Sequence, residues 1–240
     1  MDNDFVYGRV LLKLSGEALK GSSDSPYCGK SIKGLVDRLG SLVDAGVELA
    51  IVVGGGNIWR GAKSTDLTLN RVTADYMGML ATVMNAIYLR DALNHGGFSA
   101  EVQTSIPMMP VASPFCSATA KRSLEEGKIV IFAGGTGHPF FTTDTTAALR
   151  ALEIDAEALL KATKVDGIYT DDPVKNPAAT RYEKISYDEA LAKNLKVMDS
   201  TAFSLCRDNN LPIIVFNFSK PENLELVLQG NTSVATVVSE

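Results

Sequence analysis

The chain has 240 residues, of which 45% are hydrophobic and 21% are charged. This length accommodates one large or two small domains with a sizeable core, and the composition excludes intrinsic disorder, collagen-like repeats and coiled coils. The 23 Lys and Arg residues against 28 Asp and Glu residues give a net charge of −5, which argues against a protein that coats nucleic acid, because phosphate binding requires clustered cations.

Short β-rich runs alternate with helical periods along the chain. The first predicted strand covers residues 10–14, and the next segment places apolar residues on one helix face, namely Ile32, Leu35, Val36, Leu39, Leu42 and Val43. Further strands are predicted at 48–53, 100–104, 128–133, 158–162, 211–217 and 234–238. Further helices are predicted at about 72–94, 117–126, 144–154, 186–194, 199–209 and 221–229. This alternation predicts an α/β fold with a mostly parallel central sheet, helices on both faces, and ligands at the carboxyl ends of strands.

The cysteines and the amino terminus indicate the cellular compartment of the protein. The three cysteines, Cys28, Cys116 and Cys206, form no CxxC pair and suggest neither a disulfide framework nor a zinc knuckle. The amino terminus is acidic where a signal peptide is basic, and no apolar run approaches the length of a membrane span. We therefore expect a reduced, cytoplasmic location without membrane association.

Three predicted strands are followed by glycine-rich loops, at Ser15–Gly16, Gly54–Asn57 and Gly134–Gly137. Glycine allows the backbone to approach a ligand closely, so that successive N–H groups can point at an anion. A single glycine after a strand is usually only a turn, but three such loops, with Lys13 and Arg60 adjacent, favour phosphate binding. The familiar nucleotide motifs do not fit, because Asp24 stands where a Walker A loop needs its first glycine and Trp59 stands where a dinucleotide fingerprint needs its third.

Five motifs in order resemble the bacterial uridylate kinases, the UMP kinase branch of the amino-acid kinase family. They are Lys13-Leu14-Ser15-Gly16-Glu17, Gly54-Gly55-Gly56-Asn57 with Arg60-Gly61, Asp75 with residues 77–82, residues 136–144, and residues 161–167. The resemblance implies a single three-layer α/β/α sandwich over 1–240, with an acceptor-binding lobe over about 1–155 and an ATP-binding lobe over about 156–240. It also implies a homohexamer that phosphorylates UMP with ATP and Mg²⁺ in pyrimidine biosynthesis, and allosteric control that includes feedback inhibition by UTP.

The candidate catalytic residues are Lys13, Arg60 and Asp144, and their side chains suit the requirements of this reaction. The attacking phosphate oxygen of a nucleoside monophosphate is largely deprotonated at neutral pH, so no general base is required, and catalysis depends on positioning and charge neutralisation. Lys13 and Arg60 are expected to stabilise the transferred phosphoryl group. From the residues alone Asp144 is a candidate helix cap, and the resemblance adds a role in organising the catalytic lysine or the metal.

The resemblance also assigns the binding residues. Those for ATP are Lys13, Leu14, Ser15, Gly16, Gly56, Arg60, Thr163, Tyr169 and Asp172. Those for UMP are Gly55, Asp75, Thr136, Gly137, His138, Pro139, Phe140, Phe141, Thr142 and Thr143. No protein residue is expected to ligate the metal directly. Asp75 would accept from the ribose hydroxyls, although without the neighbouring motif it is a solvent-facing helix carboxylate. Phe140 and Phe141 are interpreted as core or pocket wall, with a base-stacking platform as the open alternative. Lys161 and Lys164 are candidates for secondary phosphate contacts or for structural or solvated roles.

Two segments depart from the family pattern. Residues 22–30 stand where the family usually has Gly-Phe-Gly-Ile-Asp, with Tyr27 as the aromatic and Cys28 in place of a glycine. In the resembled family this loop is linked to activation by GTP, so the altered sequence argues against that activation here. His138 stands where asparagine is common, and it can still donate a hydrogen bond. Two alternatives stay open: an enzyme of the same fold that acts on a carboxylate or carbamate, and a non-catalytic nucleotide sensor.

Overall fold

The computed structural model describes residues 5–22, 24–60, 69–171, 173, 175–195 and 198–240. Over these residues nine strands form one sheet in the order β4-β3-β5-β2-β1-β6-β8-β9-β7. Their bounds are β1 Arg9–Leu14, β2 Glu48–Val53, β3 Ala100–Thr104, β4 Ser113–Pro114, β5 Ile129–Ala133, β6 Ala158–Thr163, β7 Lys184–Ser186, β8 Ile213–Asn217 and β9 Ala235–Ser239. All neighbours pair in parallel except β8 and β9, which are antiparallel.

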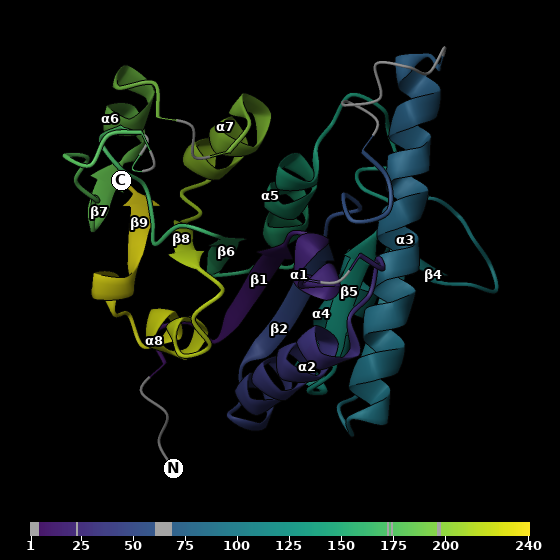
Figure 1. Ribbon diagram of the computed structural model, residues 1–240. Helices are drawn as coiled ribbons and strands as arrows, with labels where there is room; N and C mark the ends of the chain where they lie inside the picture. Colours follow the sequence, from purple (N-terminus) through teal and green to yellow (C-terminus); the bar gives the residue numbers. More distant parts are fainter. Residues whose placement is uncertain (1–4, 23, 61–68, 172, 174, 196–197) are drawn as a thin grey trace.

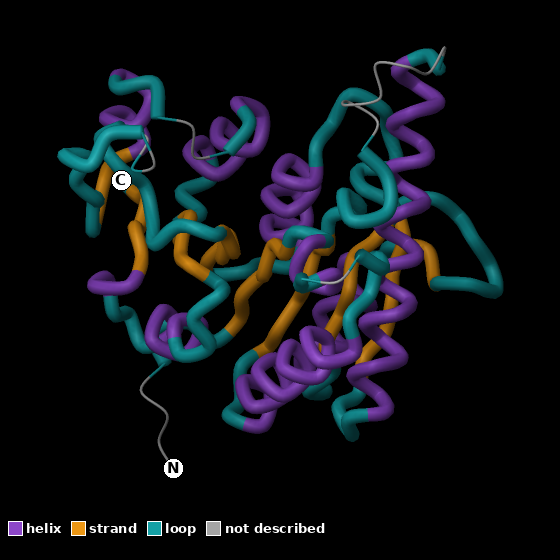
Figure 2. The backbone as a smooth tube through the Cα atoms, viewed as in Figure 1, coloured by secondary structure: helices purple, strands orange, loops and turns teal. Residues whose placement is uncertain are grey.

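Helices connect the strands and cover both faces of the sheet (Figures 1 and 2). Their bounds are α1 Glu17–Lys20, α2 Gly29–Asp44, α3 Arg71–His95, α4 Ser117–Glu125, α5 Thr143–Glu153, α6 Tyr187–Ala192, α7 Ser200–Asp208, α8 Asn223–Leu228 and the 3₁₀ turn η2 Thr232–Val234. Figure 1 shows α5 and α7 on one side of the central strands and α2 and α8 on the other. The predicted three-layer α/β/α arrangement is therefore confirmed.

Alternating residues of the central strands supply two separate cores. Leu12 and Ile51 belong to the core under α2, α3 and α8, whereas Leu11 and Val52 belong to the core under α4, α5, α6 and α7. Because successive strand residues point to opposite faces, a strand that is covered on both sides must be apolar throughout. This accounts for β2, in which every residue after Glu48 is buried.

The predicted strands and longer helices agree with the structure to within about two residues at their ends, but short elements were not predicted. The two-residue strand β4 contains Pro114 and lies at one edge of the sheet, and the three-residue strand β7 lies at the other. Segments this short contain too few residues to show a hydrophobic period. The four-residue helix α1 was missed for the same reason.

The sheet order brings the three glycine-rich loops to one place. They follow β1, β2 and β5, which are adjacent parallel strands, so their carboxyl ends share one edge of the sheet. This is the position at which sheets of this kind bind ligands. Within the described part of the chain, no helix has both the length and the apolar character that a membrane span requires.

Candidate active site

Two lysines and one aspartate meet near the carboxyl ends of the central strands. Lys13 and Lys161 are register partners on the parallel strands β1 and β6, and Asp144 lies in the first turn of α5. The Nζ atoms of Lys13 and Lys161 each lie 2.8 Å from one oxygen of the Asp144 carboxylate. The three side chains are only 15–16% exposed. One carboxylate therefore holds two ammonium groups in place at a site that is mostly shielded from water.

The charges within this cluster shift the proton equilibria of its members. Burial by itself would raise the pKa of Asp144, but the positive charges of Lys13 and Lys161 outweigh it and bring the pKa of this carboxyl below its usual range. Burial also lowers the pKa of Lys161, against the opposing effect of Asp144. Asp144 is thus ionised at neutral pH, and with both lysines protonated the cluster carries a net positive charge toward an incoming anion.

Asp144 does not cap helix α5, so that interpretation of the sequence is wrong. The cap is Thr142, whose side-chain oxygen accepts from the backbone N–H groups of Asp144 and Thr145 at 3.0 and 3.2 Å. Asp144 lies inside the first turn, and its carboxylate contacts the two lysines instead. An anion is also favourable there because the helix amino terminus carries a partial positive charge.

Asp199 joins the amino termini of α5 and α7, a role that the sequence did not indicate. Its carboxylate accepts from the hydroxyls of Thr142 and Thr145 on one side. On the other side it caps α7 by accepting from the backbone N–H of Ala202 at 3.0 Å. Asp199 thereby fixes the turn that carries Asp144, through contacts between residues more than fifty positions apart.

Gly16 of the first loop and Gly55 of the second are required by close approach. A Cβ on Gly16 would overlap the side-chain oxygen of Asn57 and lie 2.7 Å from the carbonyl oxygen of Gly54. A Cβ on Gly55 would lie 2.8 Å from the Cβ of Ala81 on α3. The backbone N–H of Gly54 also donates to the carbonyl of Leu14 at 2.9 Å. The loops after β1 and β2 are therefore packed directly against each other and against α3.

The third loop keeps its shape through the backbone conformation of its glycines and a hydrogen bond to α3. Gly134, Gly135 and Gly137 have φ angles of 75°, 59° and 82°, which are the left-handed values that glycine adopts at little cost. The hydroxyl of Thr82 on α3 accepts from the backbone N–H of Gly134 at 2.9 Å. Helix α3 thus supports both the second loop and the third.

Arg60 is engaged by its neighbours in this structure. Its guanidinium pairs with Glu17 of α1, and its Nε donates to the carbonyl of Gly56 at 2.7 Å. About half of the side chain is exposed to solvent. Arg60 therefore bridges the first and second loops, and its pairing with Glu17 was not predicted.

A smaller cavity of about 170 Å³ lies between the second loop, α3 and the start of α5. Its lining includes six of the residues singled out from the sequence, namely Gly55, Gly56, Asp75, Phe141, Thr142 and Thr143. Gly56, which the resemblance assigned to ATP, lies here beside Gly55. Met79 and Thr82 of α3 also line the cavity, and neither was singled out. The cavity combines an apolar wall with one carboxylate and three threonine side chains.

The Asp75 carboxylate fixes one side of this cavity. It accepts from the Nε of Arg71, one turn away on α3, at 2.8–2.9 Å, and from the backbone N–H of Phe140 at 2.8 Å. Phe140 has a φ of 73°, an uncommon value for a bulky residue. Phe140 and Phe141 are 65% and 51% exposed, so their interpretation as core is wrong, and Phe141 forms part of the pocket wall.

The remaining residues of the third loop lie nearer the surface. The Thr136 hydroxyl and the His138 backbone N–H are 3.3 Å apart, and the Nδ1 of His138 lies 3.2 Å from the Thr136 carbonyl oxygen. His138 is exposed, whereas Gly137 and Pro139 are partly buried. These four residues extend the third loop beyond the smaller cavity rather than lining it.

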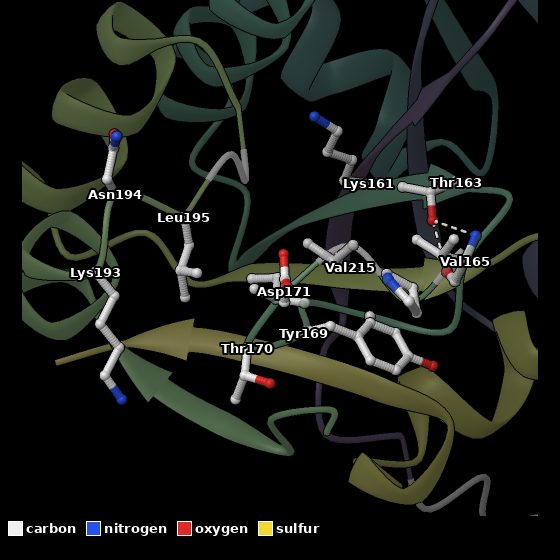
Figure 3. Close-up of a pocket in the computed structure, with 13 residues that line it drawn as sticks. Lys161, Thr163, Val165, Tyr169, Thr170, Asp171, Lys193, Asn194, Leu195 and Val215 are labelled. Atoms are coloured by element: carbon white, nitrogen blue, oxygen red, sulfur yellow. Dashed lines mark hydrogen bonds between the residues drawn. The ribbon is translucent and has the colours of Figure 1, made fainter. Parts of the chain in front are cut away.

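A larger cavity of about 710 Å³ lies beside β6. Thr163 and Tyr169, both singled out from the sequence, line it together with Lys161, Lys193 and Asn194. Figure 3 shows Thr163 and Tyr169 on one side of this cavity and Asn194 on the other, with Lys161 above them. Asp172 lies outside the described residues. Of the first-loop residues, Ser15 is exposed, while Leu14 is wholly buried and presents only its backbone to a ligand.

The site has no dedicated metal cage in the part of the chain that the structure describes. There, no group of three or more His, Cys, Asp or Glu side chains is placed to hold a metal ion. Both oxygens of Asp144 face ammonium groups, and those of Asp199 face hydroxyls. These donors suit a cation that arrives on a ligand's own phosphates better than one held by the protein.

The sequence and fold of this chain are similar to those of known proteins. A model of the amino acid kinase family matches residues 8–217. The chain is 40% identical to a UMP kinase from Bacillus anthracis, with a TM-score of 0.93 and coverage of 97% of this chain and 96% of that one. It is 39% identical to a UMP kinase from Ureaplasma parvum, with a TM-score of 0.92 and coverage of 97% and 98%. A uridylate kinase from Archaeoglobus fulgidus is similar at 26% identity, with a TM-score of 0.74 and coverage of 96% and 99%.

Proposed function

The chain belongs to the amino acid kinase family, and from this premise we propose that it phosphorylates UMP to UDP with ATP, a step of pyrimidine nucleotide biosynthesis. One observation carries the proposal. Lys161 lines the larger cavity and pairs with Asp144, whose neighbours Thr142 and Thr143 line the smaller cavity. A cationic cluster thus joins two cavities of unequal size, as transfer between a nucleoside triphosphate and a monophosphate requires.

The two cavities support a division of the chain into two lobes. All residues that line the smaller cavity fall within 55–143, and all that line the larger one fall within 161–215. UMP is assigned to the first, with Asp75 on the ribose hydroxyls and the third loop, residues 136–143, around the nucleotide. ATP is assigned to the second, with Tyr169 and Thr163 beside the base and ribose and its phosphates toward Lys13, Ser15 and Gly16.

Charge neutralisation and alignment account for the chemistry. The UMP phosphate attacks as an anion, so no side chain needs to remove a proton. Lys13 and Lys161 stabilise the charge that spreads over the transferring phosphoryl oxygens. Asp144 holds both ammonium groups in position and does not act as a base, because its lowered pKa makes it a weak proton acceptor and both its oxygens face lysines. Arg60 contributes a planar fork for phosphate once it leaves Glu17.

Magnesium is assigned to the nucleotide rather than to the protein. Mg²⁺ in kinases is bound largely by substrate phosphates and water, and there it supplies neutralisation of phosphate charge. The Asp144 carboxylate of the lysine cluster is already paired with both cations.

An ADP-release assay tests the function directly. The protein is assayed with Mg²⁺-ATP and, in turn, UMP, CMP, dTMP, acetylglutamate, aspartate and carbamate. Selective turnover with UMP is the expected result, whereas turnover with a carboxylate or carbamate and not with UMP would establish the alternative enzyme class. ATP binding without turnover of any acceptor would indicate a nucleotide sensor.

Replacing Asp75 with alanine is expected to weaken UMP binding by about 10- to 100-fold, the effect of losing a charged hydrogen bond of about 1.5–3 kcal/mol. ATP binding should stay within about threefold, because Asp75 lines only the smaller cavity. Titration calorimetry with each nucleotide measures both effects. Asp37→Ala, which removes the aspartate of the i,i+4 ion pair with Lys33, is the control. Unchanged UMP affinity in Asp75→Ala would contradict the ribose contact.

An apolar row on α3 supports a homo-oligomer, and the family resemblance extends this proposal to a homohexamer. Residues at intervals of four on one helix face are 38–53% exposed, namely Val72, Tyr76, Leu80, Met84 and Tyr88. Such a row forms a ridge that packs well against a second helix. A two-fold axis at Leu80 places Met84 opposite Tyr76 of the second copy.

Leu80→Glu is therefore expected to yield a smaller assembly than the wild-type protein, because a two-fold axis would bring two carboxylates together in an apolar contact. Light scattering after size exclusion gives the mass. Leu191→Glu on α6, where the leucine is equally exposed, is the matched control. Equal masses for the wild-type protein and Leu80→Glu would count against this interface.

Feedback inhibition by UTP and a cytoplasmic location belong to the same proposal. UTP carries the base and ribose of the acceptor, so it can compete at the smaller cavity. GTP activation has no such support, because residues 22–30 depart from the family loop. Tyr27 of this segment instead stacks on Tyr88 of α3, with ring centroids 4.2 Å apart.

A further inference from the structure

A buried pair of side-chain amides lies where the first two glycine loops meet α3. Asn85 of α3 is fully buried, and Asn57 closes the second loop. The Nδ2 of Asn85 donates to the Oδ1 of Asn57 at 2.7 Å, and the Nδ2 of Asn57 donates back to the Oδ1 of Asn85 at 3.1 Å. The two amides therefore form a reciprocal, doubly hydrogen-bonded pair.

The remaining hydrogens of the pair bind two backbone segments. The Nδ2 of Asn85 also donates to the carbonyl of Gly54 at 2.7 Å. The Nδ2 of Asn57 also donates to the carbonyl of Pro26 at 3.0 Å. All four N–H bonds of the two amide groups are thus used, and the second loop is tied to α3 at both its first and its last residue.

The pair also determines how closely the first loop can approach. A Cβ on Gly16 would overlap the Oδ1 of Asn57, so the backbone of the first loop rests directly on this amide. In the proposed function the first loop holds the phosphates of ATP and the second loop belongs to the UMP cavity. Asn57 consequently lies at the contact between the donor loop and the acceptor loop.

Stability alone does not explain an amide at position 85. The inner face of α3 is otherwise mostly apolar, with Val83, Ala86 and Leu89 in the same core. A buried polar side chain loses its bonds to water, and satisfied partners only offset that loss. Satisfied polar networks do, however, select a single arrangement of the groups that they connect. The pair is therefore suited to fixing the geometry of the loops.

We propose that Asn57 and Asn85 are positioning residues that hold the donor loop against the acceptor loop, so that the two phosphates are aligned for transfer. This inference rests on the proposed function. Neither amide is assigned a contact with a reacting atom, and they act through the backbone of Gly16 and Gly54. A displacement of about 1 Å can lower a transfer rate by roughly 10²-fold, so small loop shifts are sufficient.

The test measures kcat, KM and separate nucleotide affinities for Asn57→Ala, Asn85→Ala and the double variant. We expect kcat to fall by about 10- to 100-fold in each single variant, while the Kd values for ATP and UMP measured separately stay within about threefold. The double variant should lose no more than the worse single variant, because both substitutions break one unit. Asn94→Ala is the control: Asn94 lies on the same helix and bonds the backbone of Ala100, far along the chain from the loops.

A purely structural pair would lower the melting temperature and leave kcat of the folded enzyme unchanged, and that result would overturn the inference. So would a loss confined to the KM or Kd of one nucleotide, or additive losses in the double variant. If Asn85→Ala does not fold, Asn57→Ala decides, because Asn57 is only partly buried. Wild-type protein without UMP turnover would refute the proposed function and this inference with it, whereas active wild-type protein with an equally active Asn57→Ala variant refutes the inference alone.

Discussion

Replacing Lys13 with alanine is expected to reduce kcat for UMP phosphorylation by about 10²- to 10³-fold, the loss seen when one preorganised donor to a transition-state charge is removed. Lys13 is one of two ammonium groups on the Asp144 carboxylate, and it lies at the end of β1 beside the first glycine loop. Steady-state assays with saturating Mg²⁺-ATP and UMP measure the effect. The loss should appear in kcat rather than in KM, because the charge that Lys13 stabilises develops in the transition state.

The fold should tolerate this change better than the reaction does. Asp144 keeps Lys161 as a partner at 2.8 Å, so we expect the free energy of unfolding to fall by only about 2 kcal/mol. Lys33→Ala, which removes an exposed lysine from an ion pair with Asp37, is the control for loss of a lysine and should retain activity. Near-normal turnover of the Lys13→Ala variant would contradict the assignment of the catalytic cluster.

Replacing Asp144 with asparagine is expected to reduce both kcat and stability. The change keeps the shape of the side chain but removes the only negative charge between two mostly buried lysines. Leaving a buried charge without its partner costs about 3–5 kcal/mol. The two ammonium groups would then repel each other, and one would lose its proton or turn away from the phosphates. We expect kcat to fall by about 10²-fold or more, measured beside chemical unfolding of the same samples.

The pH dependence separates this electrostatic role from a packing role. Because the folded pKa of Asp144 is lowered, its contribution to stability is present above its unfolded pKa of about 3.9 and is lost as the pH falls through the folded value. The stability difference between wild type and Asp144→Asn should therefore be full at pH 7 and shrink below about pH 4. A difference that does not vary with pH would indicate packing instead.

Asp144→Asn should also change how kcat depends on pH at alkaline values. Burial already lowers the pKa of Lys161, and Asp144 opposes that shift. Without the carboxylate the pKa of Lys161 should fall further, so residual kcat should decline at a lower pH than in the wild type. Asp37→Asn, which removes an exposed carboxylate paired with Lys33, is the matched control and should leave both profiles unchanged.

The sequence determined the layered fold because its hydrophobic periods are local. Residues 48–53 form a nearly continuous apolar run, broken only by Glu48, before three glycines, and the structure has a strand with those bounds. Successive strands joined by helices imply parallel neighbours, and this placed the three glycine loops at one edge. The exceptions, β4 and β7, are two and three residues long, too short to show a period.

Within the site, the sequence singled out residues whose neighbours along the chain show their purpose. Lys13 lies two residues before the first glycine loop, and Gly55 and Gly56 lie within the second. Thr163 ends β6 and Tyr169 lies in the segment that follows it, and both line the larger cavity. The strand and the loop that follows it supply the signal for Lys13 and the glycines, whereas Thr163 and Tyr169 were assigned by the family resemblance.

Tertiary structure alone decided which side chains meet across the chain. The residues alone suggested Asp144 as a cap, and the resemblance added a role in organising the catalytic lysine. The folded chain places Lys161, interpreted only as a secondary phosphate contact, on the same carboxylate as Lys13. Asp199 and Asn85 gave no signal, because their partners lie more than fifty and about thirty positions away. A lone polar residue on a helix has the same local pattern whether it faces water or a buried backbone carbonyl. Its role depends on which distant segments the fold brings to it, and that information is not contained in any local period.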